Sequence, residues 1–192
     1  MVEQVPYSLL AELENVRNKS KPPIHLWRPD YVNDIDMTIE ADGSWTYMGT
    51  PITRHRLSHL FSTVLRREDD GDYYLVTPVE KCRITVRDAP FLAILLQVTG
   101  EGREQSLQFT TNMADELTAD AEHPLRIDET GSPSPYIMVR NGLEAKLTRS
   151  VYYQLAERVV QENDQWGVWS RNVFFPLAAV QSCVQELRPG DT

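Results

Sequence analysis

The sequence has few of the features that identify common protein classes. Its 192 residues include only two cysteines, Cys82 and Cys183, which are too few for a disulfide scaffold and too far apart for a local metal knuckle. The longest nearly uninterrupted apolar run, residues 91–98, is far too short to cross a bilayer as a helix. The first residues show no signal-peptide pattern. We therefore expect a soluble, cytoplasmic protein with reduced thiols.

Positive charge is also scarce. The chain has 19 Lys and Arg against 28 Asp and Glu, for a formal net charge of −9. This balance argues against broad binding of long nucleic acids and against a polybasic attachment to membranes. Because 41% of the residues are hydrophobic, the chain can bury a substantial core. Its length corresponds to one large domain or two small ones.

Conventional catalytic and metal-binding motifs are absent. The sequence contains no phosphate loop, no dinucleotide-binding glycine motif and no nucleophile elbow. His55 and His59 have the spacing of a helical metal-binding pair, but no third ligand accompanies them, which favours a solvated helix face. Cys82 lies in an alternating strand pattern, which favours a buried thiol. We predict no catalytic residue, metal site or cofactor; the sequence favours a non-enzymatic protein without deciding the question.

Hydrophobic periodicity predicts the secondary structure. Alternation over residues 35–47 predicts a β-hairpin that turns at Asp42 and Gly43. Residues 111–135 are polar and rich in loop-forming residues. Further strands are predicted at 73–77, 82–86, 91–98, 106–110, 125–127, 136–139 and 144–147.

Apolar residues at helical spacing predict two main helices. The first follows Thr53 as its N-cap and ends near Arg67, and the second follows Thr148. The apolar face of the second helix is predicted to comprise Tyr152, Leu155, Ala156, Val159 and Val160. An additional amphipathic pattern begins at Pro6 and predicts an N-terminal helix.

The two main helices indicate an internal repeat. A shift of 95 residues places Thr53 and Arg54 on Thr148 and Arg149, and aligns the apolar stripes of both helices. We interpret this as two copies of a unit made of a hairpin, a capped helix and a strand. The sequence therefore predicts an α+β fold with two related halves.

Cationic residues provide the strongest indication of a binding site. Residues 53–67 contain four arginines and no acid, whereas residues 115–129 contain six acids and one arginine. Arg54 and Arg149 follow the two caps, where the helix N-terminus favours anions and a guanidinium adds bidentate donors. Two interpretations remain open: these arginines bind a phosphate or carboxylate, or they pair with acids of the other copy.

Polar residues also gather at predicted strand ends. Residues 77–81 form a short turn that contains Thr77, Glu80 and Lys81, and Asp88 follows the next strand. These side chains can line a pocket, although ordinary strand-end turns have the same composition.

Seven sequence runs resemble the bacterial domain-of-unknown-function family 1285, over about residues 27–175. The runs are IDMTI (35–39), DGSWTYMGTPI (42–52), LFSTVLR (60–66), LVTPVEK (75–81), DAPF (88–91), VRNGLEA (139–145) and RSVYY (149–153).

The resemblance implies a duplicated α+β architecture whose C-terminal half is similar to a pleckstrin-homology domain. On this basis we expect an N-terminal helix and connector (1–21), an N-terminal α+β domain (22–88) and a C-terminal pleckstrin-homology-like domain (89–192). It further implies a site for a nucleotide-like ligand at the interface of the halves and a role in signal transduction. With Arg54 added from the repeat, the expected ligand-binding residues are Arg54, Thr77, Glu80, Lys81, Asp88, Arg140, Glu144 and Arg149.

The expected roles follow from side-chain chemistry. Lys81, Arg140 and Arg149 would meet anionic oxygens, and Glu80 or Glu144 would accept hydrogen bonds from a base or ribose. Trp45 or Tyr152 would stack on a base.

Three functions are consistent with the sequence. The leading one is a ligand-sensing or signalling module that binds a small anionic, nucleotide-like ligand and acts on a signalling protein partner. The alternatives are a protein-interaction or scaffold domain with structural arginines and, less favoured, a nucleotide-processing enzyme. The sequence does not predict the oligomeric state.

Overall fold

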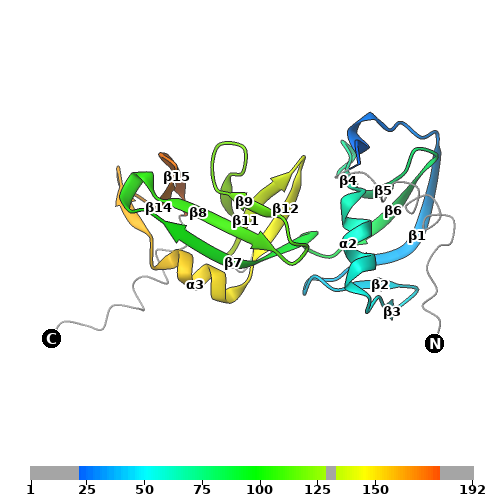
Figure 1. The fold of residues 1–192 in the computed structure, drawn as a ribbon, viewed down its shortest axis with the longest axis horizontal. Coiled ribbons are helices and arrows are strands. Elements are labelled where there is room, and N and C mark those ends of the chain that lie inside the picture. The colour runs from blue at the N-terminus through cyan, green and yellow to red at the C-terminus, as the bar shows by residue number, and fades with distance from the viewer. Residues whose placement is uncertain (1–21, 129–132, 178–192) are drawn as a thin grey trace. The chain divides into compact units, whose positions relative to one another are not determined.

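The computed structural model describes residues 22–128 and 133–177, which belong to two compact units (Figure 1). Unit 1 is Met1–Pro90 and unit 2 is Phe91–Thr192. The predicted N-terminal helix and Cys183 lie outside the described residues. None of the helices in the described residues has the length and apolar character needed to cross a bilayer.

Unit 1 contains a six-stranded sheet with the strand order β3-β2-β1-β6-β5-β4. The central strands β1 and β6 are parallel, and all other neighbours are antiparallel. The elements are η1 (Ile24–Leu26), β1 (Tyr31–Ile39), β2 (Trp45–Tyr47), β3 (Thr50–Pro51), α2 (His55–Thr63), β4 (Leu65–Arg67), β5 (Tyr73–Val76) and β6 (Glu80–Val86).

The predicted hairpin at Asp42 and Gly43 is confirmed. Gly43 has a φ of 78°, which is readily accessible only to glycine, and the Asp42 carboxylate accepts a 2.9 Å hydrogen bond from the Ser44 amide. As a result, β2 returns antiparallel to β1, with Trp45 opposite Ile39.

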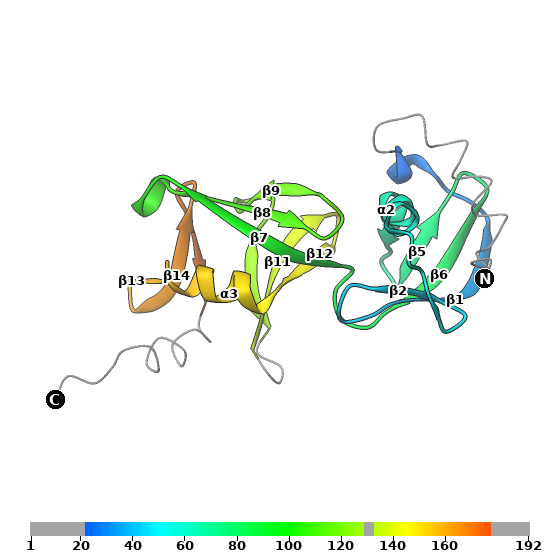
Figure 2. The ribbon, with the colours of Figure 1, turned by 60° about the horizontal axis from the view of Figure 1, so that its bottom comes forward.

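Helix α2 packs on one face of this sheet (Figures 1 and 2). Phe61 of the helix stacks on Trp45 of β2, with ring centroids 6.0 Å apart, and both side chains are buried. Met37, Ile39 and Leu75 are also completely buried in this unit. The apolar stripe of α2 therefore forms part of the core of unit 1.

Two details of the predicted first helix are wrong. Its N-cap residue is Arg54 rather than Thr53 and makes no side-chain capping hydrogen bond, and the helix ends at Thr63 rather than near Arg67. Leu65 instead pairs with Leu75 across β4 and β5 and is completely buried. Pairing in the sheet satisfies the backbone of residues 65–67 and buries Leu65, so it replaces the last helical turn.

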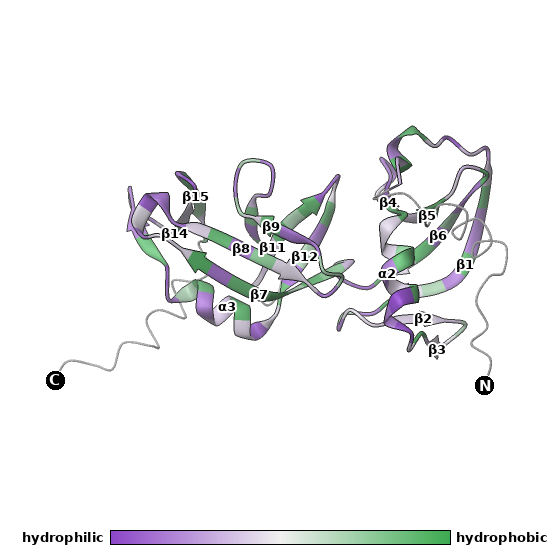
Figure 3. Ribbon diagram, in the orientation of Figure 1, coloured by the Kyte–Doolittle hydropathy of each residue, from purple (hydrophilic) through white to green (hydrophobic). Residues whose placement is uncertain are grey.

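Unit 2 contains a second six-stranded sheet, with the order β10-β11-β12-β7-β8-β9, and a separate three-stranded sheet, β13-β14-β15. The apolar run at residues 91–98 forms most of β7, which Figure 3 shows mainly in the hydrophobic colour. The elements are β7 (Phe91–Thr99), η2 (Gly102–Glu104), β8 (Ser106–Thr111), β9 (Glu116–Thr118), β10 (Leu125–Asp128), β11 (Ser134–Arg140), β12 (Leu143–Leu147), α3 (Arg149–Ala156), β13 (Val160–Glu162), β14 (Gln165–Ser170) and β15 (Val173–Pro176).

The strands predicted in unit 2 are confirmed as β7, β8, β10, β11 and β12, and the helix after Thr148 as α3. Thr148 is the N-cap of α3, as predicted, although its side chain makes no capping hydrogen bond. Val159 and Val160 lie beyond the helix, and Val160 begins β13. Strand β9 was not predicted, because three residues are too few to show a clear alternation in a polar segment.

The three-stranded sheet is attached to the connection between β7 and β8. The amides of Arg171 and Asn172, at the tip of the β14–β15 hairpin, donate 2.8 Å hydrogen bonds to the carbonyls of Gln105 and Arg103. The buried Ser170 hydroxyl accepts a hydrogen bond of 3.1 Å from the Leu107 amide. These bonds fix the hairpin on the larger sheet of unit 2.

The structure is α+β in two units, but it does not confirm the 95-residue duplication or the pleckstrin-homology-like roll. Both six-stranded sheets pair their first strand in parallel with their last, and they share one strand order. The helices occupy different places, however. Helix α2 connects β3 to β4 within one sheet, whereas α3 follows the last strand of its sheet and leads into a separate sheet.

Gly167 provides a test of packing in unit 2. A Cβ atom at this position would lie 2.3 Å from the Phe175 carbonyl oxygen and 2.5 Å from Phe174 Cζ. We expect Gly167→Ala to lower the free energy of unfolding by about 2–3 kcal/mol in urea denaturation. Gly102→Ala is the control, because it meets only backbone strain at a φ of +63° and should cost about 1 kcal/mol. Equal losses in the two variants would contradict this packing.

Candidate functional site

The strongest candidate site is the exposed basic face of α2, which we define as Arg54, His55, Arg56 and His59. All four residues are exposed, and the first turn of the helix contains no acidic residue. Figure 3 shows this start of α2 in the hydrophilic colour. The face exists because the opposite side of the helix, which includes Phe61, is buried against the sheet.

Two of these side chains are available to a ligand. Among the described residues, the side chains of Arg56 and His59 take part in no hydrogen bond or ion pair. The Arg54 carbonyl accepts hydrogen bonds from the amides of Leu57 at 2.8 Å and Ser58 at 3.3 Å, which begins the helix. Since no side chain caps the first turn, its positive end adds to the field of the two arginines.

The other arginines at the end of this basic segment have structural roles. Arg66 pairs with Glu68 and donates to the carbonyls of Ile24 at 2.8 Å and Trp27 at 3.0 Å, which holds η1 against β4. Arg67 lies over the ring of Tyr73. The charge available to a ligand is therefore concentrated at the start of α2.

A second charged group joins β1, β6 and the turn before β5. Arg83 donates to both carboxylate oxygens of Asp34, at 2.7 and 3.2 Å, and to Asp72 at 3.0 Å. These bonds lower the pKa of Asp34 and raise the pKa of Arg83. Because both acids are occupied by the guanidinium, this group serves to connect the strands.

Thr77, one of the expected ligand-binding residues, closes the turn between β5 and β6. Its buried hydroxyl accepts the Glu80 amide and donates to the Glu80 carbonyl, both at 3.1 Å. Lys81 lies 4.6 Å above the Tyr74 ring and 3.7 Å from a Glu68 oxygen. Asp88 is half-buried just after β6.

Glu80 is largely buried beside Cys82. Burial, together with the nearby Glu80 charge, raises the pKa of the Cys82 thiol to about 12. The predicted buried thiol is thus confirmed, and its raised pKa disfavours the thiolate form at neutral pH.

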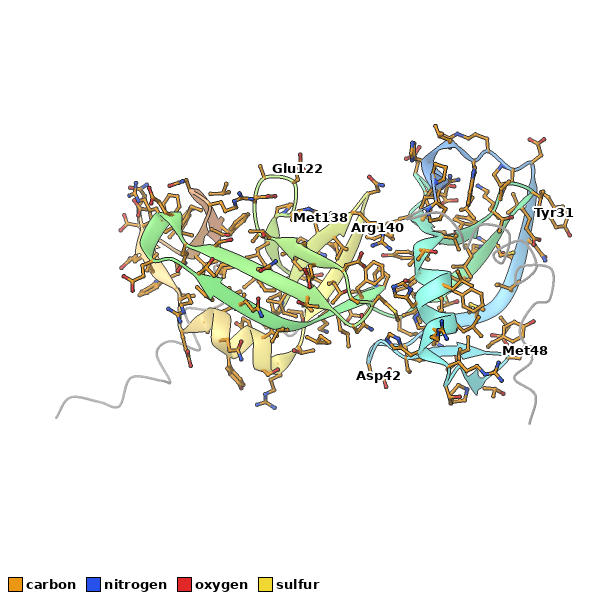
Figure 4. All side chains as sticks on the ribbon, in the orientation of Figure 1. Tyr31, Asp42, Met48, Glu122, Met138 and Arg140 are labelled. Carbon is orange, nitrogen blue, oxygen red and sulfur yellow. The ribbon has the colours of Figure 1, made fainter. Side chains whose placement is uncertain are left out.

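The expected residues of unit 2 are also engaged by their neighbours. Arg140 donates to Asp115 at 3.0 Å and lies 4.9 Å above the Phe91 ring; Figure 4 labels it at the end of β11. Both oxygens of Glu144 accept 2.6 Å hydrogen bonds from Arg126.

Arg126 and Arg149 each contact a tyrosine. The Arg126 guanidinium stacks 4.5 Å above the Tyr136 ring, and its bonds to Glu144 raise its pKa. Arg149, at the first turn of α3, donates to the Tyr153 hydroxyl at 3.1 and 3.0 Å.

The eight expected ligand-binding residues are divided between the units. Arg54, Thr77, Glu80, Lys81 and Asp88 belong to unit 1, whereas Arg140, Glu144 and Arg149 belong to unit 2. Arg56 was not among the expected residues, although the absence of acids around it was visible in the sequence. Among the described residues, no group of His, Cys, Asp or Glu could hold a metal ion.

The two α+β units, each with the same strand order around a central parallel pair, define a two-domain protein. Residues 22–89 match the N-terminal domain of unknown function DUF1285, and residues 90–177 match the DUF1285 C-terminal domain. The chain belongs to the DUF1285 family.

Two crystal structures of family members are similar to this chain. The DUF1285 family protein from Silicibacter pomeroyi DSS-3 is 45% identical, with a TM-score of 0.85, and the match covers 92% of this chain and 97% of that one. The family protein from Shewanella baltica OS155 is 31% identical, with a TM-score of 0.52, and the match covers 64% of this chain and 91% of that one. No curated protein matches the chain.

The structural role of Glu144 can be tested by a double-mutant cycle with Arg126. We expect Glu144→Gln to lower the free energy of unfolding by about 0.5–1 kcal/mol, because the bidentate pair is lost at a partly exposed site. The same change in an Arg126→Gln background should cost much less, as measured by urea denaturation. Additive effects would contradict the pairing.

Cys82 should be nearly inert in the folded protein. In a Cys183→Ser background, we expect almost no reaction of Cys82 with a thiol reagent at pH 8, and full reaction in urea. A pKa of about 12 instead of 9.0 leaves roughly a thousandth of the thiolate. Because the folded pKa is raised, this thiol's contribution to stability should be present below about pH 9 and lost toward pH 12. Rapid labelling of the folded chain would contradict the burial.

Proposed function

We propose that the protein is a non-enzymatic module that binds a small anionic ligand through the basic face of α2. The observation that carries this proposal is the unpartnered Arg56 among the described residues, flanked by Arg54, His55 and His59 and by no acid in residues 53–67. Guanidinium groups bind phosphate and carboxylate with paired, directional hydrogen bonds.

The electrostatic setting favours a small ligand over a polymer. The whole chain has a net charge of −9, so a long polyanion would be repelled outside a short basic segment. A compact phosphate compound needs only a few cations and the positive end of a helix. We therefore propose a ligand that carries phosphate, with a nucleotide as the leading class.

Such a module would act by reporting the presence of its ligand to a signalling protein. A cytoplasmic location forms part of this proposal, since soluble nucleotides are available there. Binding itself would not require a catalytic residue.

A thermal-shift and calorimetric screen of nucleotides and other phosphate compounds tests the proposal. At one hundred times its Kd, a ligand should stabilise the protein by about 2.7 kcal/mol. We expect the Arg54→Ala/Arg56→Ala variant to bind at least tenfold more weakly, because two charge-assisted contacts are lost.

The control is Arg158→Ala in unit 2. The Arg158 side chain is exposed and has no partner among the described residues. This variant should bind as the original chain does. The absence of any hit, or an equal loss in the control, would overturn the proposal.

A protein-interaction or scaffold domain is the second candidate. It is favoured by the arginines that serve structure within their own unit, such as Arg66 with η1, Arg83 with Asp34 and Arg126 with Glu144. If this function is correct, no phosphate compound should stabilise the unmodified chain or the Arg54→Ala/Arg56→Ala variant. The same variant should bind an isolated partner protein more weakly.

A further inference from the structure

We propose that residues 31–36 of β1 form an open strand edge that receives an extended, basic peptide segment of a partner protein. The segment would add a strand to the sheet of unit 1, with main-chain hydrogen bonds providing affinity and alternate side chains providing selectivity. This interaction surface is separate from the basic face of α2 and does not depend on the function proposed for that face.

The edge is open because β1 is longer than its neighbour β2. On one side, β6 pairs in parallel with residues 31–34. On the other side, β2 pairs only with residues 37–39. One further hydrogen bond on that side, of 2.8 Å from the Met48 amide to the Asp36 carbonyl, marks the end of this pairing. In the described part of the chain, no strand pairs with residues 31–35 on that side. Figures 1 and 2 show this half of β1 extending beyond β2.

The side chains of the open edge are unusually exposed for a strand. Tyr31 is 60% exposed and Val32 is 52% exposed, whereas Met37 and Ile39 in the paired half are fully buried. Figure 4 shows Tyr31 projecting away from the sheet. Because successive side chains of a strand point to opposite faces, each face offers an apolar contact to an added strand.

This edge lacks some of the features that usually prevent strand addition. Natural edge strands are very short, carry proline or charged side chains, lysine above all, or are distorted by a β-bulge. The open edge is not short, although it carries two aspartates and its register against β6 shifts between Asp34 and Thr38. In unit 1, the edge strand β3 consists of only Thr50–Pro51 and thus has two of these protections. Residues 31–36 contain no lysine, arginine or proline.

Charge identifies the partner as basic. Asp34 and Asp36 lie on the open edge and Asp30 directly precedes it; of the three, only Asp34 is paired, with Arg83. The side chains of Asp30 and Asp36 have no partner among the described residues. A second copy of the chain would bring the same acids together, and like charges on adjacent strands are destabilising. A segment that alternates basic and apolar residues matches both the acids and the exposed Tyr31 and Val32.

The test uses an acetylated eight-residue peptide of alternating lysine and valine, with a fluorescent label, added to the full chain. We expect saturable binding by fluorescence anisotropy and slower amide hydrogen exchange confined to residues 31–36. A peptide with the same composition but grouped lysines and valines, and a peptide of alternating glutamate and valine, should bind at least tenfold more weakly.

A charge-reversal variant tests the proposed selectivity. Asp30→Lys/Asp36→Lys should weaken binding of the lysine–valine peptide roughly tenfold and should favour the glutamate–valine peptide. The control is Asp69→Lys/Asp164→Lys, which changes the net charge equally at two exposed turn positions and should leave both affinities unchanged.

Four results would overturn the inference: no binding of the lysine–valine peptide, equal binding of the grouped peptide, unchanged exchange at residues 31–36, or equal effects of the two double variants. A concentration-dependent dimer that protects residues 31–36 without peptide would also overturn it, because the occupant of the edge would then be a second copy.

Discussion

The parallel pairing of β1 with β6 is the constraint on which the rest of unit 1 depends. It joins Tyr31 to Glu80 and Ile39 to Val86, so the first and last strands of the sheet lie at its centre. Closing a segment of this length costs chain entropy, which the intervening hairpins and helix must offset by burying apolar side chains. The same solution appears in unit 2, where β7 pairs in parallel with β12.

Both proposed binding surfaces follow from this arrangement. The connection from β3 to β4 has to cross the sheet, and α2 does so with Phe61 against Trp45 in the core. The opposite side of the same helix must then face outward, which presents Arg54 and Arg56. Because β1 is paired with β6 over its first residues but with β2 only over its last, the same pairing also leaves the open edge.

Local features could be predicted from the sequence because they depend on neighbouring residues. Alternation located β5, β6 and β8, and Asp42 and Gly43 located the hairpin turn. The end of α2 could not be predicted, since Leu65 has an apolar helical spacing but gains more by pairing with Leu75. The parallel pairs and the separate sheet β13-β14-β15 also depend on contacts between residues distant in sequence, which periodicity does not report.

The candidate site shows the same division. The absence of acids near Arg54 and Arg56 was evident in the sequence and led to the basic face of α2. In contrast, the sequence does not distinguish a Glu144 that binds a ligand from one that pairs with Arg126. Only the structure shows that both carboxylate oxygens accept hydrogen bonds from Arg126. Thr77 is similar, since its hydroxyl is used within its own turn.

The most direct test of the central claim is a nitrogen-15 NMR titration of the full chain, whose mass of 22.0 kDa suits the method, with inorganic pyrophosphate. We predict saturable shifts of the backbone amides of residues 54–59, with the amides around Arg83 and Arg126 unchanged. Shifts absent from residues 54–59, or equally large at Arg83 and Arg126, would contradict an anion site on the basic face of α2.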